Sequence, residues 1–157
     1  MNGLDFSKLT VTDIELVTLA QGKAGAVLPL VDPTNFQLRL PRKQHGLVLV
    51  QKGKGRYVFQ NQLVLETNPG TLLYLPKGWK YYVETLEASE VICVNFSVLE
   101  DVSPEPWVYK LKNTARWAEL FENLLRLWRY PAPGYNARCK SLLYEMLASV
   151  EEEQHAK

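Results

Sequence analysis

The stretch Gly70-Thr-Leu-Leu-Tyr-Leu-Pro76-Lys-Gly78-Trp-Lys-Tyr81 decides which fold the sequence predicts. The residues between Gly70 and Pro76 are apolar and favour a strand. Pro76 fixes its own φ and Gly78 tolerates a positive φ, so this pair predicts a tight turn. The next strand then starts close to residue 80. We therefore expect Tyr81 to point into the interior of a barrel.

On both sides of this stretch, short runs rich in Val, Leu and Tyr continue up to residue 110. Gly or Pro interrupts these runs at intervals of about ten residues, which is typical of a β-sandwich or barrel. Gly53-Lys-Gly55 and Asn61 are predicted as tight turns between neighbouring strands. The predicted strands cover residues 14–19, 34–40, 46–52, 55–60, 62–67, 70–75, 80–85, 90–97 and 107–110.

After residue 113 the apolar period changes to that of a helix. Asn113 or Thr114 is the expected N-cap, and the two prolines between residues 130 and 134 end the helix. A second helix, to about residue 153, is expected to run antiparallel because the loop is short. It is long and has one apolar face, which does not favour a DNA-reading helix-turn-helix. The first helix carries apolar side chains at i, i+3, i+4, i+7 and i+11: Trp117, Leu120, Phe121, Leu124 and Trp128.

The composition indicates one ordinary globular domain. The chain has 157 residues, of which 46% are hydrophobic and 22% charged, and its net charge is +1. A near-neutral chain is a poor candidate for a dedicated nucleic-acid coat or a membrane-surface binder. Two cysteines make no disulfide framework, and neither a signal peptide nor a membrane-spanning run is apparent. We therefore expect a cytoplasmic protein with reduced thiols and no membrane partner.

The charges are unevenly distributed along the chain. Residues 33–65 contain six basic side chains and no acidic one, whereas residues 82–109 contain six acidic side chains and no basic one. We expect the two segments to face each other across a sheet, because strands far apart in sequence pair in this kind of fold. A nucleic-acid stripe is the alternative, but it lacks a recognisable motif with interleaved aromatic residues.

The sequence offers no set of residues for catalysis or for metal binding. It contains only two histidines, His45 and His155, whereas a divalent site of the usual type needs three or more protein ligands. Cys93 and Cys139 lie in apolar patterns that indicate inert core thiols. There is also no nucleophile motif, P-loop or Rossmann fingerprint. We expect no catalytic residue, no metal and no cofactor.

The first stretch resembles the second conserved motif of the cupin barrels, G-x5-P-x-G-x2-H, with Tyr81 in place of the histidine. Residues 46–55 resemble the strand and turn that close the first cupin motif. In metal-binding cupins, the first motif supplies two histidines and a glutamate. The corresponding positions here, close to Gly46 and between Arg39 and Arg42, hold none of these ligands.

A barrel without metal ligands, followed by two helices, resembles the N-terminal sensor domain of AraC-type transcriptional regulators. The resemblance covers nearly the whole chain and rests on residues 46–55, 69–82 and 95–96 and on the helical pair. It implies a mainly β fold, a cupin-like double-stranded β-helix (jelly-roll barrel) followed by two antiparallel helices. Residues 1–112 would form the effector-binding barrel with an N-terminal arm that closes over the effector. Residues 113–157 would form a dimerisation segment and the start of a linker.

The same resemblance implies partners and site residues. The partners are a small effector, often a sugar, and a second copy of the chain, with DNA bound only through helix-turn-helix units that this sequence does not contain. Leu142, Leu143, Leu147 and Val150 are the expected dimer interface. In the family, an early-strand arginine and residues on two later strands contact the ligand; the aromatic residues offer flat faces for stacking. The candidate ligand-binding residues are Arg39, His45, Tyr57, Trp79, Tyr81, Cys93 and Asn95.

Two alternatives stay open at the level of the sequence. The first is a metal-free cupin enzyme, such as a sugar epimerase or isomerase, which needs an acid/base pair in the barrel. His45 with Tyr57 or Tyr81 is the candidate pair for that chemistry. The second alternative is a stand-alone carbohydrate-binding protein without a regulatory role.

Overall fold

Two long strands, β3 and β6, organise the structure. The computed structural model describes residues 4–20, 24–28 and 40–155, so the strand expected over residues 34–40 lies almost wholly outside the described residues. The elements are the 3₁₀ turn η1 (Phe6–Lys8), the strands β1 (Val11–Ala20), β2 (Val27–Leu28), β3 (His45–Phe59), β4 (Val64–Thr67), β5 (Thr71–Leu75), β6 (Tyr81–Val98) and β7 (Trp107–Lys110), and the helices α1 (Thr114–Arg129) and α2 (Tyr135–His155).

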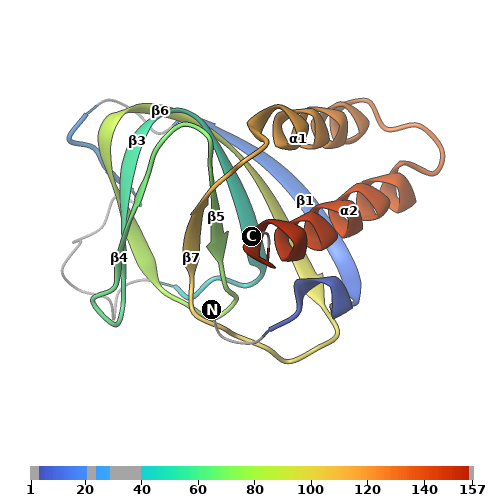
Figure 1. Ribbon diagram of the computed structural model, residues 1–157, viewed down its shortest axis with the longest axis horizontal. Coiled ribbons are helices and arrows are strands. Elements are labelled where there is room, and N and C mark those ends of the chain that lie inside the picture. The colour runs from blue at the N-terminus through green and yellow to red at the C-terminus, as the bar shows by residue number, and fades with distance from the viewer. Residues whose placement is uncertain (1–3, 21–23, 29–39, 156–157) are drawn as a thin grey trace.

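The strands form one antiparallel sheet in the order β1-β6-β3-β5-β7, with β2 paired to β6 and β4 paired to β3. The sheet curls into a barrel, and the two helices lie antiparallel on one side of it (Figure 1). The expected mainly β, cupin-like jelly roll with two C-terminal helices is thereby confirmed. Neither helix of the described chain has the length and apolar content that a bilayer-spanning helix needs.

β3 and β6 pair from His45 opposite Phe96 to Phe59 opposite Tyr81. The sequence predicted two strands in each of these regions, with a hairpin turn at Gly53-Lys-Gly55. The predicted turn is wrong, because β3 continues through these residues. The strand bends there, and its register with β6 shifts between Val50 and Gly55. Gly53 has a φ of +77°, and a Cβ there would lie 2.6 Å from the Cα of Ser89 on β6. The glycine therefore marks a bulge inside a long strand rather than a chain reversal.

The sheet separates two apolar cores because successive side chains on a strand point to opposite faces. Leu47 and Leu49 of β3 pack toward the helices, whereas Val48 and Val50 pack into the barrel. β6 alternates in the same way. Its helix-facing side chains are Ile92, Val94 and Phe96, and its barrel-facing side chains include Val91 and Cys93.

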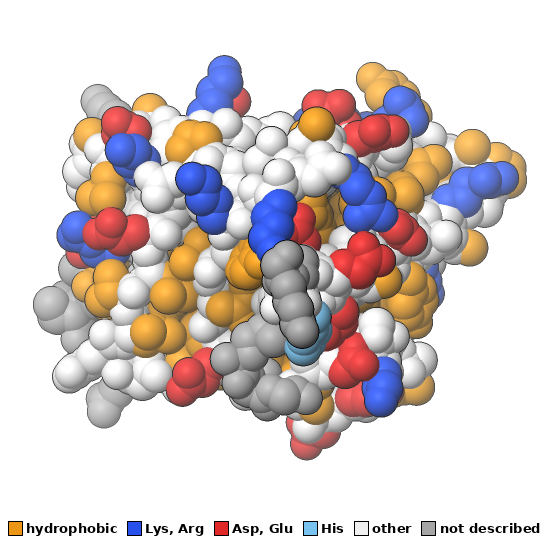
Figure 2. All heavy atoms as spheres, viewed as in Figure 1, with side chains coloured by type: hydrophobic (Ala, Val, Ile, Leu, Met, Phe, Trp, Pro, Cys, Tyr) orange, Lys and Arg blue, Asp and Glu red, His pale blue; other side chains and the backbone are white. Residues whose placement is uncertain are grey.

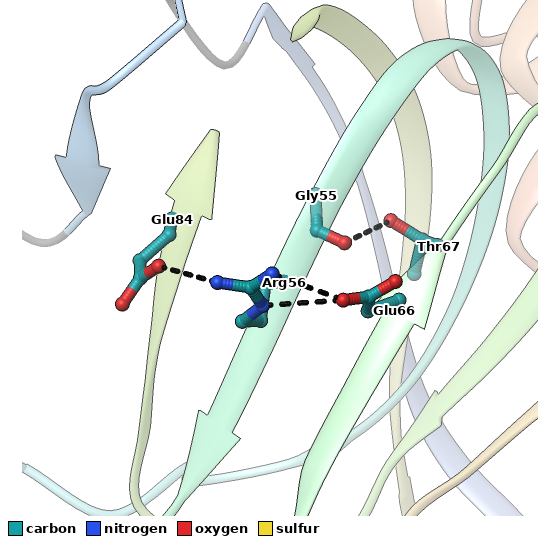
Figure 3. Close-up of polar contacts among 5 residues, drawn as sticks. All are labelled: Gly55, Arg56, Glu66, Thr67 and Glu84. Atoms are coloured by element: carbon teal, nitrogen blue, oxygen red, sulfur yellow. Dashed lines mark hydrogen bonds and ion pairs between the residues drawn. The ribbon is translucent and has the colours of Figure 1, made fainter. Parts of the chain in front are cut away.

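The expected pairing of opposite charges across the sheet is confirmed. Arg56 of β3 lies between Glu84 of β6, at 3.4 Å, and Glu66 of β4, at 3.1 Å (Figure 3). Lys52 is paired with Glu90 in the same register, with 3.7 Å between the charged atoms. Such exposed pairs contribute little stability and weaken with salt. On the face drawn in Figure 2, basic and acidic side chains are interspersed and form no field of one sign.

The helices begin and end close to where the sequence predicts. The Asn113 side chain accepts a hydrogen bond from the Arg116 N–H at 3.1 Å and caps α1 as expected. One expectation for α2 needs correction. Leu143, Leu147 and Val150 are at most 1% exposed, because they fill the core between α2, α1 and the sheet. Of the four residues expected at the dimer interface, only Leu142 is partly exposed.

The described N-terminal residues lie against α2, on the helix side of the sheet. The Phe6 N–H donates to Glu151 Oε1 at 2.6 Å, and the Val11 N–H donates to the Tyr144 hydroxyl at 2.8 Å. The Phe6 ring packs edge-on against Tyr74, with 4.9 Å between ring centroids. In these residues the arm implied by the family resemblance covers the helices and not the barrel interior.

The Gly53→Ala variant tests the bulge. The new methyl group would collide with the backbone of Ala88 and Ser89 while φ stays positive, so we expect a loss of about 3 kcal/mol or more in the free energy of unfolding. Gly134→Ala is the matched control. Gly134 has a φ of +86° but nothing within 4 Å of its Cβ position, and it should lose only about 1–2 kcal/mol. Urea titrations of the three proteins measure both losses, and equal losses would contradict the steric account.

Candidate ligand-binding site

The barrel interior contains a cavity of about 390 Å³. This volume lies in the range of small-molecule sites, which begins at about 300 Å³. Residues from β1, β3, β5 and β6 line the cavity, together with two residues that precede β3. They are Val17, Leu19, Leu40, Arg42, Val48, Tyr57, Leu75, Tyr81, Val83, Val91, Cys93 and Asn95.

Arg42 carries the polar chemistry of this cavity. Its Nη1 donates to the Tyr81 hydroxyl at 3.0 Å, its Nη2 donates to Asn95 Oδ1, and its Nε donates to the Gln44 carbonyl at 3.1 Å. The Cys93 thiol donates to the same Asn95 oxygen at 3.3 Å. Burial raises the pKa of the Tyr81 hydroxyl, and it raises the pKa of the Cys93 thiol to about 11. Both groups are therefore neutral near pH 7 and can act as hydrogen-bond donors.

Two features of the sequence hold Arg42 in place. Its backbone is paired with the turn after β5: the Gly78 N–H donates to the Arg42 carbonyl at 2.8 Å, and the Arg42 N–H donates to the Trp79 carbonyl at 3.1 Å. Gly46 leaves room for the guanidinium, since a Cβ at Gly46 would lie 2.6 Å from Arg42 Nη2. The Pro-x-Gly turn that predicted the fold thus also positions the basic side chain.

The structure brings four of the predicted site residues together at the cavity: Tyr57, Tyr81, Cys93 and Asn95. Cys93 and Asn95, both named as candidates from the sequence, face the cavity from β6. Their role in binding a ligand remains a prediction. Arg39 lies outside the described residues. Trp79 does not line the cavity but packs edge-on against Phe59, with 6.0 Å between ring centroids.

His45 lies on the opposite face of β3, so its expected place among the ligand-binding residues is corrected. Its Nδ1 accepts the Lys77 N–H at 3.2 Å and contacts the Tyr74 hydroxyl at 2.8 Å. A backbone N–H can only donate, so Nδ1 must keep its lone pair and the ring must be neutral. Burial, with the nearby charges of Lys77 and Arg42, lowers the pKa of His45 to about 4. His45 therefore acts as a buried structural side chain on the helix side of the sheet.

Sequence reasoning missed Arg42, the one charged residue among the described residues that line the cavity. Counting along the family motif points to Arg39, three residues before Arg42. Pro41 lies between the two arginines and breaks the regular alternation of side chains along the chain. The available signal was Gly46, a small residue at the start of an otherwise bulky strand. A glycine inside a strand often marks the close approach of another group.

The acid/base pair that a metal-free cupin enzyme would use is not assembled here. His45 faces the helices, whereas Tyr57 and Tyr81 face the cavity. Within residues 4–20, 24–28 and 40–155, no three His, Cys, Asp or Glu side chains lie close enough together to hold a metal ion.

Comparisons with known proteins agree with this fold. No protein-family model matches the sequence, and no curated protein is significantly similar to it. Among solved structures, the apo form of a ToxT variant from Vibrio cholerae strain SCE256 superposes with a TM-score of 0.60 at 10% identity. That match covers 91% of this chain and 57% of the ToxT chain. ToxT from Vibrio cholerae O395 gives a TM-score of 0.53 at 12% identity, over 88% of this chain and 54% of that chain.

A third ToxT structure, bound to (E)-4-(8-methylnaphthalen-1-yl)but-3-enoic acid, gives a TM-score of 0.52 at 9% identity, over 90% of this chain and 57% of that chain. Identities this low show a shared fold. ToxT is an AraC-family regulator, so the resemblance to AraC-type sensor domains is confirmed at the level of the fold. The chain spans a little over half the length of the ToxT chains that it matches.

The neutral state of His45 predicts a pH-dependent stability. Its pKa is about 4 in the folded protein and 6.5 in the unfolded chain, so the unfolded chain binds more protons between these values. The free energy of unfolding should therefore fall as the pH drops from 6.5 to about 4, by roughly 3 kcal/mol in total. Urea titrations across this range should show a flatter profile for His45→Phe. Equal slopes in the wild-type protein and in His45→Phe would refute the assignment.

Proposed function

We propose that this chain is the ligand-sensing part of an AraC-type transcription regulator. A small effector binds in the barrel cavity, and its binding controls DNA-binding units outside this chain. The cavity of about 390 Å³, with Arg42, Tyr81 and Asn95 gathered on its wall, is the observation that carries the proposal. The shared fold with ToxT regulators over 91% of the chain supports it.

The chemistry of the walls favours an effector with an apolar body. Most lining side chains are aliphatic, and the polar groups belong to a few residues around Arg42. A sugar presents hydroxyl groups on all sides and needs more donors and acceptors than these walls offer. The aromatic acid bound in one ToxT structure is a ligand of the favoured kind, held by a protein of the same fold.

A route from the cavity to the helices follows from the two faces of the sheet. Val91 and Cys93 line the cavity, whereas Ile92 and Val94, their neighbours on β6, pack in the helix-side core. A ligand that shifts β6 must therefore also shift the surface on which α1 and α2 rest, because both faces are closely packed. We infer that effector binding changes how the helices are presented to the rest of a regulator.

We also infer that the sensor forms a homodimer through α2. The three residues buried in the chain are excluded from that contact, so the interface must use the outer face of the helix. Leu142 lies at the edge of the buried stripe, where it is partly exposed and also packs against the helix-side core. A partly exposed apolar side chain beside solvated positions suits pairing with a second copy.

Blocking the cavity tests the sensor assignment. Val91→Phe places a larger side chain in the cavity from a position that is 3% exposed. We expect wild-type protein to show a raised thermal midpoint with at least one of four probes: 1-naphthaleneacetate, 1-naphthaleneacetamide, octanoate or L-arabinose. In Val91→Phe that rise should disappear while the midpoint without a probe stays close to the wild-type value.

Val64→Phe is the matched control for this experiment. Val64 lies on β4, is 46% exposed and is not among the residues that line the cavity. The Val64→Phe variant makes the same chemical change away from the site, so its thermal midpoint should rise with the probes as in the wild-type protein. An undiminished rise in Val91→Phe would show that the probe binds elsewhere and would contradict the proposal.

Sedimentation equilibrium tests the homodimer. Wild-type protein should sediment as a dimer at micromolar concentration, and Leu142→Asp should sediment as a monomer, because it places a charge in the apolar contact. Leu99→Asp, at a position 72% exposed after β6, should remain dimeric. A wild-type protein that is strictly monomeric at high concentration would overturn the dimer.

A further inference from the structure

The charge of Arg42 is not balanced by any described residue. The guanidinium is partly buried, and its three partners, the Tyr81 hydroxyl, the Asn95 amide oxygen and the Gln44 carbonyl, are all neutral. No carboxylate among the described residues lies within 4 Å of it. A charged group held against an apolar cavity without a counter-ion is unfavourable, since neutral dipoles replace its water only in part.

The surroundings of the cavity carry little negative charge. Apart from Arg42, every described residue that lines it is uncharged. Glu15 of β1, the register partner of Asn95, acts electrostatically on Cys93, but its side chain is exposed to solvent. The described walls of the cavity are therefore apolar and carry one positive charge.

The hydrogen-bond inventory of Arg42 shows what an occupant would meet. A guanidinium has five N–H donors, and the contacts to Gln44, Tyr81 and Asn95 use one each on Nε, Nη1 and Nη2. One donor on each terminal nitrogen has no partner among the described residues. Two donors are the number that a carboxylate accepts in a bidentate pair. The Tyr81 hydroxyl accepts from Arg42 and so keeps its own proton to donate to the same anion.

From these observations we propose that the effector is a small monocarboxylic acid with an apolar body. Its carboxylate pairs with the two remaining donors of Arg42 and with the Tyr81 hydroxyl, and its hydrocarbon part lies against the aliphatic walls. This inference rests on the proposed function, since it names the ligand class of that same cavity. One guanidinium matches one carboxylate, whereas a phosphate dianion would leave excess negative charge in an apolar space.

Matched acid and amide pairs separate charge from shape. The probes are octanoate with octanamide, and 1-naphthaleneacetate with 1-naphthaleneacetamide; within each pair only the charge and one head-group atom differ. The dissociation constants of the wild-type chain are measured by isothermal titration. Each acid that binds should do so at least about tenfold more tightly than its amide. That ratio is expected because hydrogen bonds to a buried charge are stronger than neutral ones.

Two variants assign that preference to Arg42. Arg42→Gln should bring the affinities of acid and amide to within about threefold of each other, while the amide still binds. Lys43→Gln removes the same charge from the adjacent, exposed residue and should keep the wild-type ratio. The thermal midpoint of Arg42→Gln without ligand shows whether that variant is folded. If it is not, Gly46→Ala, which displaces the guanidinium without removing it, takes its place.

The outcomes distinguish the two proposals. Amides or L-arabinose that bind wild-type protein as tightly as the acids would overturn the carboxylate inference and leave the sensor function standing. An acid preference that persists in both Arg42→Gln and Gly46→Ala would also overturn it, because the anion would then be held elsewhere. If no probe binds even at millimolar concentration, the carboxylate inference fails, and with it this account of the cavity.

Discussion

The pairing of β3 with β6 is the interaction on which the rest of the structure depends. These two strands are hydrogen-bonded from His45 opposite Phe96 to Phe59 opposite Tyr81, and every other strand except β7 pairs with one of them. The pair bends at Gly53, so the same two strands reach from one end of the barrel to the other. A side chain at that bend would meet the backbone of the partner strand, so the bend requires a glycine at this position.

The same pairing makes one sheet the wall between two different interiors. On the helix side, aromatic and aliphatic groups pack closely around Phe96 and Trp117, and the N-terminal Phe6 is part of this core. On the barrel side, the packing leaves a cavity. Alternate side chains of the same strands line both interiors, so a displacement of these strands would move both. The sensing function that we propose rests on this arrangement.

Arg42 gives the cavity its chemical character. The residue precedes the first long strand, and its position depends on the turn at Pro76–Trp79 and on the space left by Gly46. Its partners are all neutral, so the charge is oriented but not compensated within the described residues. Within the described residues a guanidinium faces apolar walls. The ligand class that we propose follows from that combination.

The sequence by itself determined the class of fold, because turn chemistry and periodicity act over a few residues. The Pro76-x-Gly78 turn, the N-cap at Asn113 and the helical period after residue 113 could all be predicted in this way. The opposite charges of β3 and β6 could also be predicted, because one block of the sequence is basic and the other is acidic.

Only the tertiary structure decided what depends on contacts between distant segments. It showed that Gly53 is a bulge, that His45 faces the helices and that Leu143, Leu147 and Val150 fill an internal core. It also showed that Arg42 enters the cavity, which depends on a turn more than thirty residues away and on a glycine four residues on. Local patterns specify which residues form a strand or a helix, but the neighbour that each side chain meets is set by how those elements pack.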